Sequence, residues 1–238
     1  MRTLLFLKHV TILNRANELI NERIILIMPG YDSLHFTKTD LNEQEMYKLM
    51  IGSVVPRPIA WVSSKSKEGF LNLAPFSFFT IASRNPPTLL LSIGPGVGER
   101  AGTIKDTLTN IREVGEFVIN MVSESLGEAM QRSSANLEPQ RNEFELAGVT
   151  PKICKKVDVP AVLEAPIAFE LKLDRIIPVG EDHLILGTVE HVQLDPSVYA
   201  GDYRIEINKW NPLASLAGDF SGLTPTFSIG PDNSKNQI

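Results

Sequence analysis

The sequence predicts a mainly β protein in which short strands form an antiparallel barrel, accompanied by a few helices. Six or seven apolar runs of strand length follow one another at hairpin-like spacing. Sixteen glycines and sixteen prolines in 238 residues supply the turns between them. The strands do not alternate regularly with long helices, which disfavours a doubly wound parallel sheet. A closed or split barrel is favoured because closure removes exposed strand edges.

Composition excludes several classes of function. The net charge of −5 and the absence of a dense Lys/Arg stripe disfavour binding to nucleic acid or to an anionic membrane. No apolar run reaches the roughly 18 residues that a transmembrane helix needs. Cys154 is the only cysteine and no N-x-[ST] glycosylation sequence occurs, so a cytoplasmic location is predicted.

The chain is expected to have three parts. Residues 1–27 are predicted to be an N-terminal extension upstream of the functional domain, with Met28 as an alternative start. Charged residues interrupt its apolar ones, which argues against a secretory signal. A rival interpretation is an amphipathic helix that docks on the barrel or on a second subunit. The domain is expected over 28–222, and the polar residues 223–238 are expected to form a flexible tail.

Periodicity and turn residues predict the individual elements. Helices are expected over 41–50, 103–113 and 126–133. Asp40 is the expected N-cap of the first helix, with Glu43 as its capping-box partner. Asp106 or Thr107 is expected to cap the second, and Gly115 to close it.

The strands are expected to be short and apolar, with a surface excursion of little regular structure over 135–166. Their predicted ranges are 58–64, 72–74, 78–82, 88–93, 116–122, 168–177 and 183–194, the last two joined by a turn at 180–182.

Common catalytic motifs are missing. There is no P-loop, H-E-x-x-H, C-x-x-C or G-x-S-x-G pattern. The glycine-rich run 94–99 fails as a dinucleotide fingerprint because Glu99 stands where the third glycine is needed. The histidines lack zinc-ligand spacing, so no metal site is expected. Glu143 and Glu145 are predicted to lie on a solvated face and not to act as a catalytic pair.

Three segments have the composition of a binding site. In 52–64, prolines on both sides of Arg57 fix the backbone around a side chain suited to an anion. In 72–79, small residues beside Asn72 and aromatic residues would let a flat ring approach the backbone. In 105–107, a lysine charge, a threonine hydroxyl and the amides of a helix start suit a phosphate. Each segment alone also fits an ordinary ion pair, core strand or capped helix.

Taken together, the three segments resemble the flavin reductase-like family. The family pattern is similar to S-x-x-P-R-P-I-x-x-x-S-S, then N-x-A-P-[FY]-S-x-[FY], then K-D-T-x-x-N-I. The chain carries these at 53–64, 72–79 and 105–111, in that order, and the resemblance covers about residues 45–222. It implies an antiparallel split barrel of Greek-key type that binds FMN.

The resemblance also implies roles for individual residues. His183 would lie on the nicotinamide side and is the candidate catalytic residue. Arg57, Lys105 and Thr107 would hold the phosphate, with Asp106 as a cap or as a partner that supports these residues. The candidate contacts of the flavin ring and ribityl chain are Trp61, Ser63, Ser64, Asn72, Ala74, Pro75, Phe76, Ser77 and Ser92. A lone tryptophan such as Trp61 is, however, more often part of a core.

The resemblance implies an NAD(P)H-dependent flavin reductase that transfers hydride from NADH or NADPH to FMN. It further implies a homodimer with flavin near the interface, and an oxygenase or redox protein as electron acceptor. The chain departs from the family at Ser215, where relatives often carry arginine, and at Phe220 in place of tyrosine. The alternative is therefore an FMN-binding electron carrier or flavin store without NAD(P)H turnover. A split barrel that binds no flavin and serves as an interaction module is a third hypothesis.

Overall fold

The computed structural model describes residues 33–134 and 141–227, so the prediction for 1–27 and most of that for the tail 223–238 lie outside it. The chain divides into two compact units, Met1–Ser53 and Val54–Ile238. The described part of the first unit holds helix α2 (Glu43–Ser53).

The capping of helix α2 differs from the prediction. The amide of Glu45 donates to Asn42 Oδ1 and the amide of Asn42 donates to Glu45 Oε2, whereas Asp40 accepts from Thr37. Asparagine caps as well as aspartate does, so the capping box lies two residues later.

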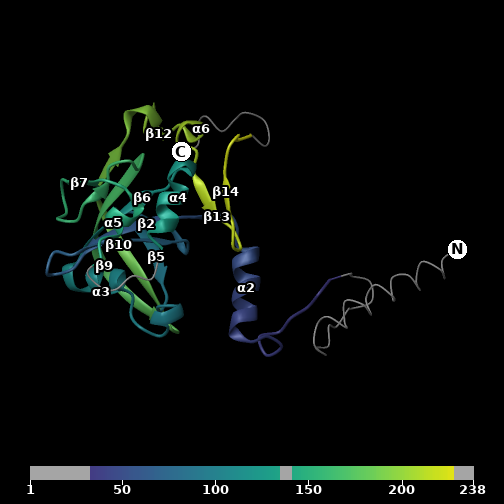
Figure 1. Cartoon of the computed structure of the whole chain (residues 1–238). Helices are drawn as coiled ribbons and strands as arrows, with labels where there is room; N and C mark the ends of the chain where they lie inside the picture. The colour runs from purple at the N-terminus through teal and green to yellow at the C-terminus, as the bar shows by residue number, and fades with distance from the viewer. Residues whose placement is uncertain (1–32, 135–140, 228–238) are drawn as a thin grey trace. The chain divides into compact units, whose positions relative to one another are not determined.

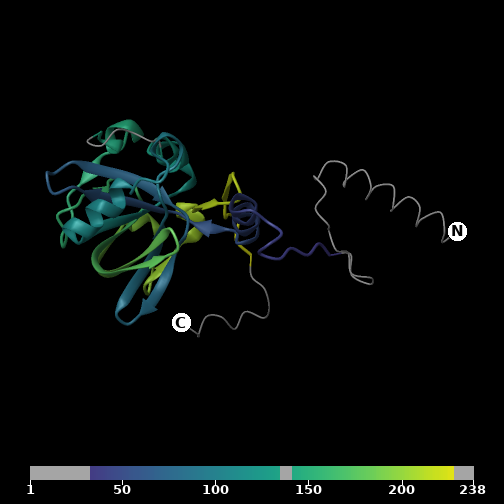
Figure 2. The same ribbon diagram turned by 90° about the horizontal axis from the view of Figure 1, so that it is seen from below.

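The second unit is built on a seven-stranded antiparallel sheet in the order β3-β2-β6-β9-β10-β5-β4 (Figures 1 and 2). Its strands are β2 (Ala60–Lys65), β3 (Leu71–Phe76), β4 (Phe79–Arg84), β5 (Pro87–Ile93), β6 (Glu116–Met121), β9 (Ile167–Val179) and β10 (Asp182–Leu194). This confirms the mainly β, antiparallel class. The barrel is not closed, because the edge strands β3 and β4 form no ladder with each other.

Smaller elements surround this sheet. The helices are η1 (Gly98–Arg100), α3 (Asp106–Val114), η2 (Glu124–Leu126), α4 (Gly127–Arg132), α5 (Glu143–Ala147), η3 (Pro196–Val198) and α6 (Ile207–Trp210). The short strands are β1 (Arg57–Pro58), β13 (Leu213–Ser215) and β14 (Phe220–Gly222) in one sheet, and the pairs β7 (Pro151–Lys152) with β8 (Ala161–Val162) and β11 (Tyr199–Gly201) with β12 (Arg204–Ile205).

Helix α3 starts three residues later than predicted. Lys105 is its N-cap and makes no side-chain capping bond, so Asp106 and Thr107 lie in the first turn and do not cap it. The predicted stop is confirmed. Gly115 has a φ of 77° and its amide donates to the Ile111 carbonyl. Glycine suits this left-handed position because it has no Cβ.

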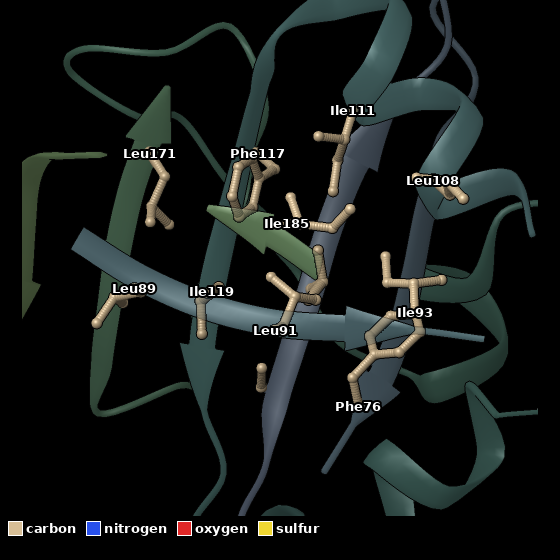
Figure 3. Close-up of a cluster of buried hydrophobic side chains, with 12 residues drawn as sticks. Phe76, Leu89, Leu91, Ile93, Leu108, Ile111, Phe117, Ile119, Leu171 and Ile185 are labelled. Carbon is tan, nitrogen blue, oxygen red and sulfur yellow. The ribbon is translucent and has the colours of Figure 1, made fainter. Parts of the chain in front are cut away.

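The main core lies on the inner face of the sheet (Figure 3). Side chains from β2, β5, β6, β9 and β10 meet there, and Leu108 and Ile111 of α3 cover them. Phe117, Leu171 and Ile185 are among its fully buried members. Helix α3 is therefore fixed by its apolar face, which also fixes where its first turn points.

A second core covers the opposite face of β2 and β3. Trp61 and Leu73 pack there against Met130 of α4 and Phe144 of α5. Strand β2 is consequently buried on both faces, with every residue from Ala60 to Ser64 buried. The excursion expected to be irregular thus carries a helix that packs on the sheet.

No helix in the described ranges is both long enough and apolar enough to cross a membrane.

Gly187 of β10 tests the packing of the main core. A Cβ placed there would lie 2.4 Å from Phe117 Cζ, an aromatic ring held by the core. We expect Gly187→Ala to lower the free energy of unfolding by about 1–3 kcal/mol through overpacking. Gly218→Ala is the matched control, because nothing lies within 4 Å of its added Cβ. Denaturant unfolding measures both, and equal stabilities for the two variants would contradict this packing.

Candidate functional site

A cavity opens where the edge strand β3 meets the start of α3. It encloses about 160 Å³. Its lining residues come from β3, the loop 96–106, the end of α4 and the start of α5: Asn72, Ala74, Pro75, Phe76, Gly96, Val97, Arg100, Thr103, Lys105, Asp106, Thr107, Ser133, Ser134 and Glu143. The second and third segments that the sequence singled out are therefore brought together here.

The edge of β3 supplies backbone groups to this cavity. Strand β3 pairs on one side with β2 only, so alternate residues present their backbone to the open side. Leu73 is one of them, because its amide donates to Glu143 Oε2 at 3.2 Å. By the same alternation Pro75 also faces outward, and it has no N–H to leave unpaired. The edge thus offers carbonyl acceptors without an unused donor at Pro75.

A buried hydrogen-bond network fixes the inner wall. Asn72 Nδ2 donates to Ser64 Oγ at 3.2 Å and to Thr107 Oγ1 at 2.9 Å. Asn110 Nδ2 donates to the same Ser64 oxygen at 3.1 Å. These bonds join β2, β3 and α3. They set the position of the Thr107 hydroxyl relative to β3.

Lys105 provides the positive charge of the cavity. Its ammonium lies 5.4 Å from the centre of the Phe76 ring, a cation–π distance. Burial lowers the pKa of Lys105 from its ordinary value, and the nearby Asp182 carboxylate offsets part of that effect. A half-buried ammonium gains more from an anionic ligand than an exposed one does, because less solvent screens the pair.

The loop before α3 is held in one shape. Arg100 makes two hydrogen bonds to the Asp106 carboxylate, at 2.7 and 2.8 Å. The Gly96 amide donates to the Thr103 carbonyl. A Cβ on Gly96 would lie 2.3 Å from the Arg100 carbonyl oxygen, so glycine is needed for this close approach.

Glu143 was expected on a solvated face, and the structure corrects this. Its side chain is only 8% exposed, because Phe144 and Ala147 anchor α5 on the second core. Glu145 on the same helix is exposed. Burial raises the pKa of Glu143 to about 7, despite the lowering effect of the Leu73 amide bond. Helical spacing alone could not show which face of so short a helix is covered.

Three predicted contacts lie behind the cavity wall. Ser63 and Ser64 are 0% exposed. Ser63 Oγ donates to the Pro160 carbonyl and accepts from Asn120. The Trp61 indole is buried and donates to Ser133 Oγ at 2.8 Å. These side chains shape the wall from within and do not line the cavity.

Arg57 is not among the residues that line the cavity with Lys105. Its guanidinium donates to the carbonyl oxygens of Val54 and Leu216 and to the hydroxyls of Ser77 and Ser215. It lines a different hollow, beside Trp210. Its bonds join β13 to the turn after β3. Ser215, which departs from the family pattern, is thus one of its partners.

The remaining predicted residues, Ser77, Ser92 and His183, lie in or beside two hollows next to the cavity. Ser77 lines a neighbouring hollow together with Pro75, Phe76 and Phe220. His183 lines another hollow, together with Glu181 and Thr103, and Thr103 also lines the main cavity. Ser92 Oγ donates to the Asp182 carboxylate at 3.1 Å, next to His183.

The donor set of the cavity fits a flavin phosphate. A lysine cation, the Thr107 hydroxyl and the first amides of a nine-residue helix are groups of the kind that bind phosphate in proteins. The volume is below the roughly 300–1,000 Å³ of enclosing ligand pockets, so this part of the site suits one end of a longer ligand. Within the described residues, no group of three or more His, Cys, Asp or Glu side chains could hold a metal.

Comparison with known proteins identifies relatives over most of the chain. A family model described as "Flavin reductase like domain" matches residues 51–213. An uncharacterized protein of Aquifex aeolicus is 38% identical over 187 residues, which are 79% of this chain and 94% of that protein.

Solved structures show the same fold. Nitrilotriacetate monooxygenase component B from Bacillus cereus has a TM-score of 0.79 at 36% identity, covering 84% of this chain and 100% of that one. The 2-nitrobenzoate 2-nitroreductase NbaA of Pseudomonas fluorescens has a TM-score of 0.75 at 29% identity, covering 84% and 96%.

The network around Ser64 yields a stability prediction. Ser64→Ala removes the oxygen that accepts from both Asn72 and Asn110, and leaves buried amide hydrogens without that partner. We expect the free energy of unfolding to fall by about 1–3 kcal/mol. Ser221→Ala, at an exposed serine, is the control. Denaturant titration compares the two, and an unchanged midpoint for Ser64→Ala would contradict a structural role.

Proposed function

The chain belongs to the flavin reductase-like family, and on that premise we propose that it is an FMN-binding oxidoreductase that transfers hydride from NADH or NADPH to flavin. The observation that supports FMN is the cavity at the start of α3, where Lys105 and Thr107 meet the edge of β3. The phosphate of FMN would add an anionic partner for Lys105 beyond the nearby Asp182 carboxylate.

We assign the phosphate to Lys105, Thr107 and the first amides of α3. The half-buried Lys105 supplies charge, and Asn72 holds the Thr107 hydroxyl in place. The bidentate Arg100–Asp106 pair fixes the loop from which Lys105 extends. The outward carbonyls of β3, with Ala74 and Pro75, are assigned to the polyol and ring, because small residues allow close approach.

Bound FMN supplies the capacity to accept hydride from a nicotinamide and pass electrons on. The chain supplies orientation and access. We place the nicotinamide on the side of His183, whose hollow borders the cavity through Thr103. There the imidazole would position the nicotinamide carboxamide or ribose by hydrogen bonding.

A second subunit and a partner protein complete the proposal. The cavity is small, and the apolar side chains of Phe78, Ile81 and Phe220 are exposed. We propose that a homodimer covers these surfaces and part of the flavin. The Bacillus cereus relative is named as a monooxygenase component, so we propose an oxygenase or redox protein as the electron acceptor.

The visible spectrum of the purified protein tests the proposal. We expect the protein to carry a flavin band after purification, or after incubation with FMN and removal of the unbound FMN. NADH or NADPH should bleach this band rapidly in the absence of oxygen. A flavin band that stays oxidised would instead support an electron carrier or flavin store. A protein that remains colourless once unbound FMN has been removed would overturn the assignment.

Lys105→Ala tests the phosphate assignment. Loss of a charged hydrogen-bond donor is worth about 1.5–3 kcal/mol, so we expect about ten- to a hundredfold weaker FMN binding. Riboflavin, which lacks the phosphate, should bind equally to both proteins. Lys152→Ala, at an exposed lysine of β7, is the charge-matched control. Flavin fluorescence titration gives the dissociation constants, and unchanged FMN affinity would exclude Lys105 from the site.

A further inference from the structure

Glu143 is a buried carboxyl in the wall of the proposed phosphate site. It lines the same cavity as Lys105 and Thr107, and its Oε2 is held by the Leu73 amide. Its position is determined twice, by the packing of α5 on the second core and by this bond to the edge of β3. Its carboxyl is therefore a fixed part of the site.

An ionised Glu143 conflicts with an anionic ligand. A carboxylate and a phosphate that share one cavity shielded from solvent repel each other. A neutral carboxyl does the opposite. Its O–H can donate to a phosphate oxygen while its other oxygen keeps the bond from Leu73.

We propose that Glu143 is a phosphate-binding residue of the flavin site, and that it acts in its neutral form as a hydrogen-bond donor. This inference rests on the proposed FMN function and adds to it a dependence on protonation. Flavin affinity is then coupled to proton uptake by a residue remote in sequence from the family motifs. Loss of that proton weakens binding and favours release of FMN.

The surroundings of Glu143 support a proton exchange near neutrality. The pKa of Glu143 is raised to about 7, chiefly by burial and to a smaller extent by Asp106, against the lowering effects of two backbone hydrogen bonds and of Arg100. The charged groups that border the two hollows lined by Glu143 are Glu68, Arg100, Lys105, Asp106 and Arg141. Arg132 of α4 also reaches α5, where it donates to the Ala147 carbonyl. The carboxyl is neutral below this pKa, so FMN affinity is high there and falls as pH rises through it.

FMN affinity at two pH values tests the proposal. Between about pH 6 and about pH 8, one unit on either side of this pKa, ionisation of Glu143 should weaken FMN binding about tenfold. Riboflavin affinity should stay constant over the same range. Fluorescence titration of the full chain measures both without any turnover.

Glu143→Gln separates the ionisation of Glu143 from other pH-dependent changes in FMN affinity. Glutamine keeps an oxygen for the Leu73 amide and offers an N–H donor, but it does not titrate. The variant should not lose FMN affinity between these pH values, because residue 143 no longer ionises. Only the second ionisation of the phosphate, with a pKa of about 6, should remain visible. Glu145→Gln, at the exposed glutamate of α5, should behave as wild type.

Several results would overturn the assignment. The first is a wild-type FMN affinity that does not fall as pH rises. The second is an equal fall of FMN affinity in Glu143→Gln. The third is an equal fall of the wild type's affinity for riboflavin. The first and third of these results come from the wild type alone, so the proposal can be overturned even if Glu143→Gln folds poorly. Absence of FMN binding at both pH values would reject the proposed function itself, which is a distinguishable outcome.

Discussion

The hydrogen bonds that converge on Ser64 determine how the site is assembled. One hydroxyl oxygen accepts from Asn72 of β3 and from Asn110 of α3, and Asn72 also binds Thr107. Three elements are joined at one point that water does not reach. Because buried amides cannot exchange these partners for water, β3 and α3 have little freedom to slide. The cavity between them, with Lys105 at its rim, depends on that restraint.

The burial of β2 on both faces makes this arrangement possible. Its inner face contributes to the main core and its outer face to the core under α4 and α5. Polar side chains on such a strand must find partners inside the protein. Ser63 does so with Pro160 and Asn120, and Ser64 with the two asparagines. Ser64 thus positions the cavity-lining Asn72 from one layer below the surface.

Much of the fold could be predicted from the sequence because its signals are local. Glycine and proline bracket the strands, and Gly115 stops α3 where a left-handed residue is required. The family resemblance also groups Lys105, Thr107, Asn72 and Pro75 in one binding site, and these four residues line one cavity. The positions of Arg57 and Glu143 could not be predicted, because each depends on a long-range contact. Arg57 is held by Leu216 and Ser215, and Glu143 by the Leu73 amide. A sequence pattern does not show which distant backbone group a side chain will meet.

The open edge of β3 has a consequence for solubility. An unpaired strand edge is a template on which a strand of another molecule can form a ladder, and such pairing leads to aggregation. Here the Leu73 amide is already bound by Glu143, and Pro75 has no N–H to offer. An approaching strand would find one donor occupied and the next one missing. Leu73 and Pro75 therefore make this edge a poor partner for another polypeptide, although it borders the cavity.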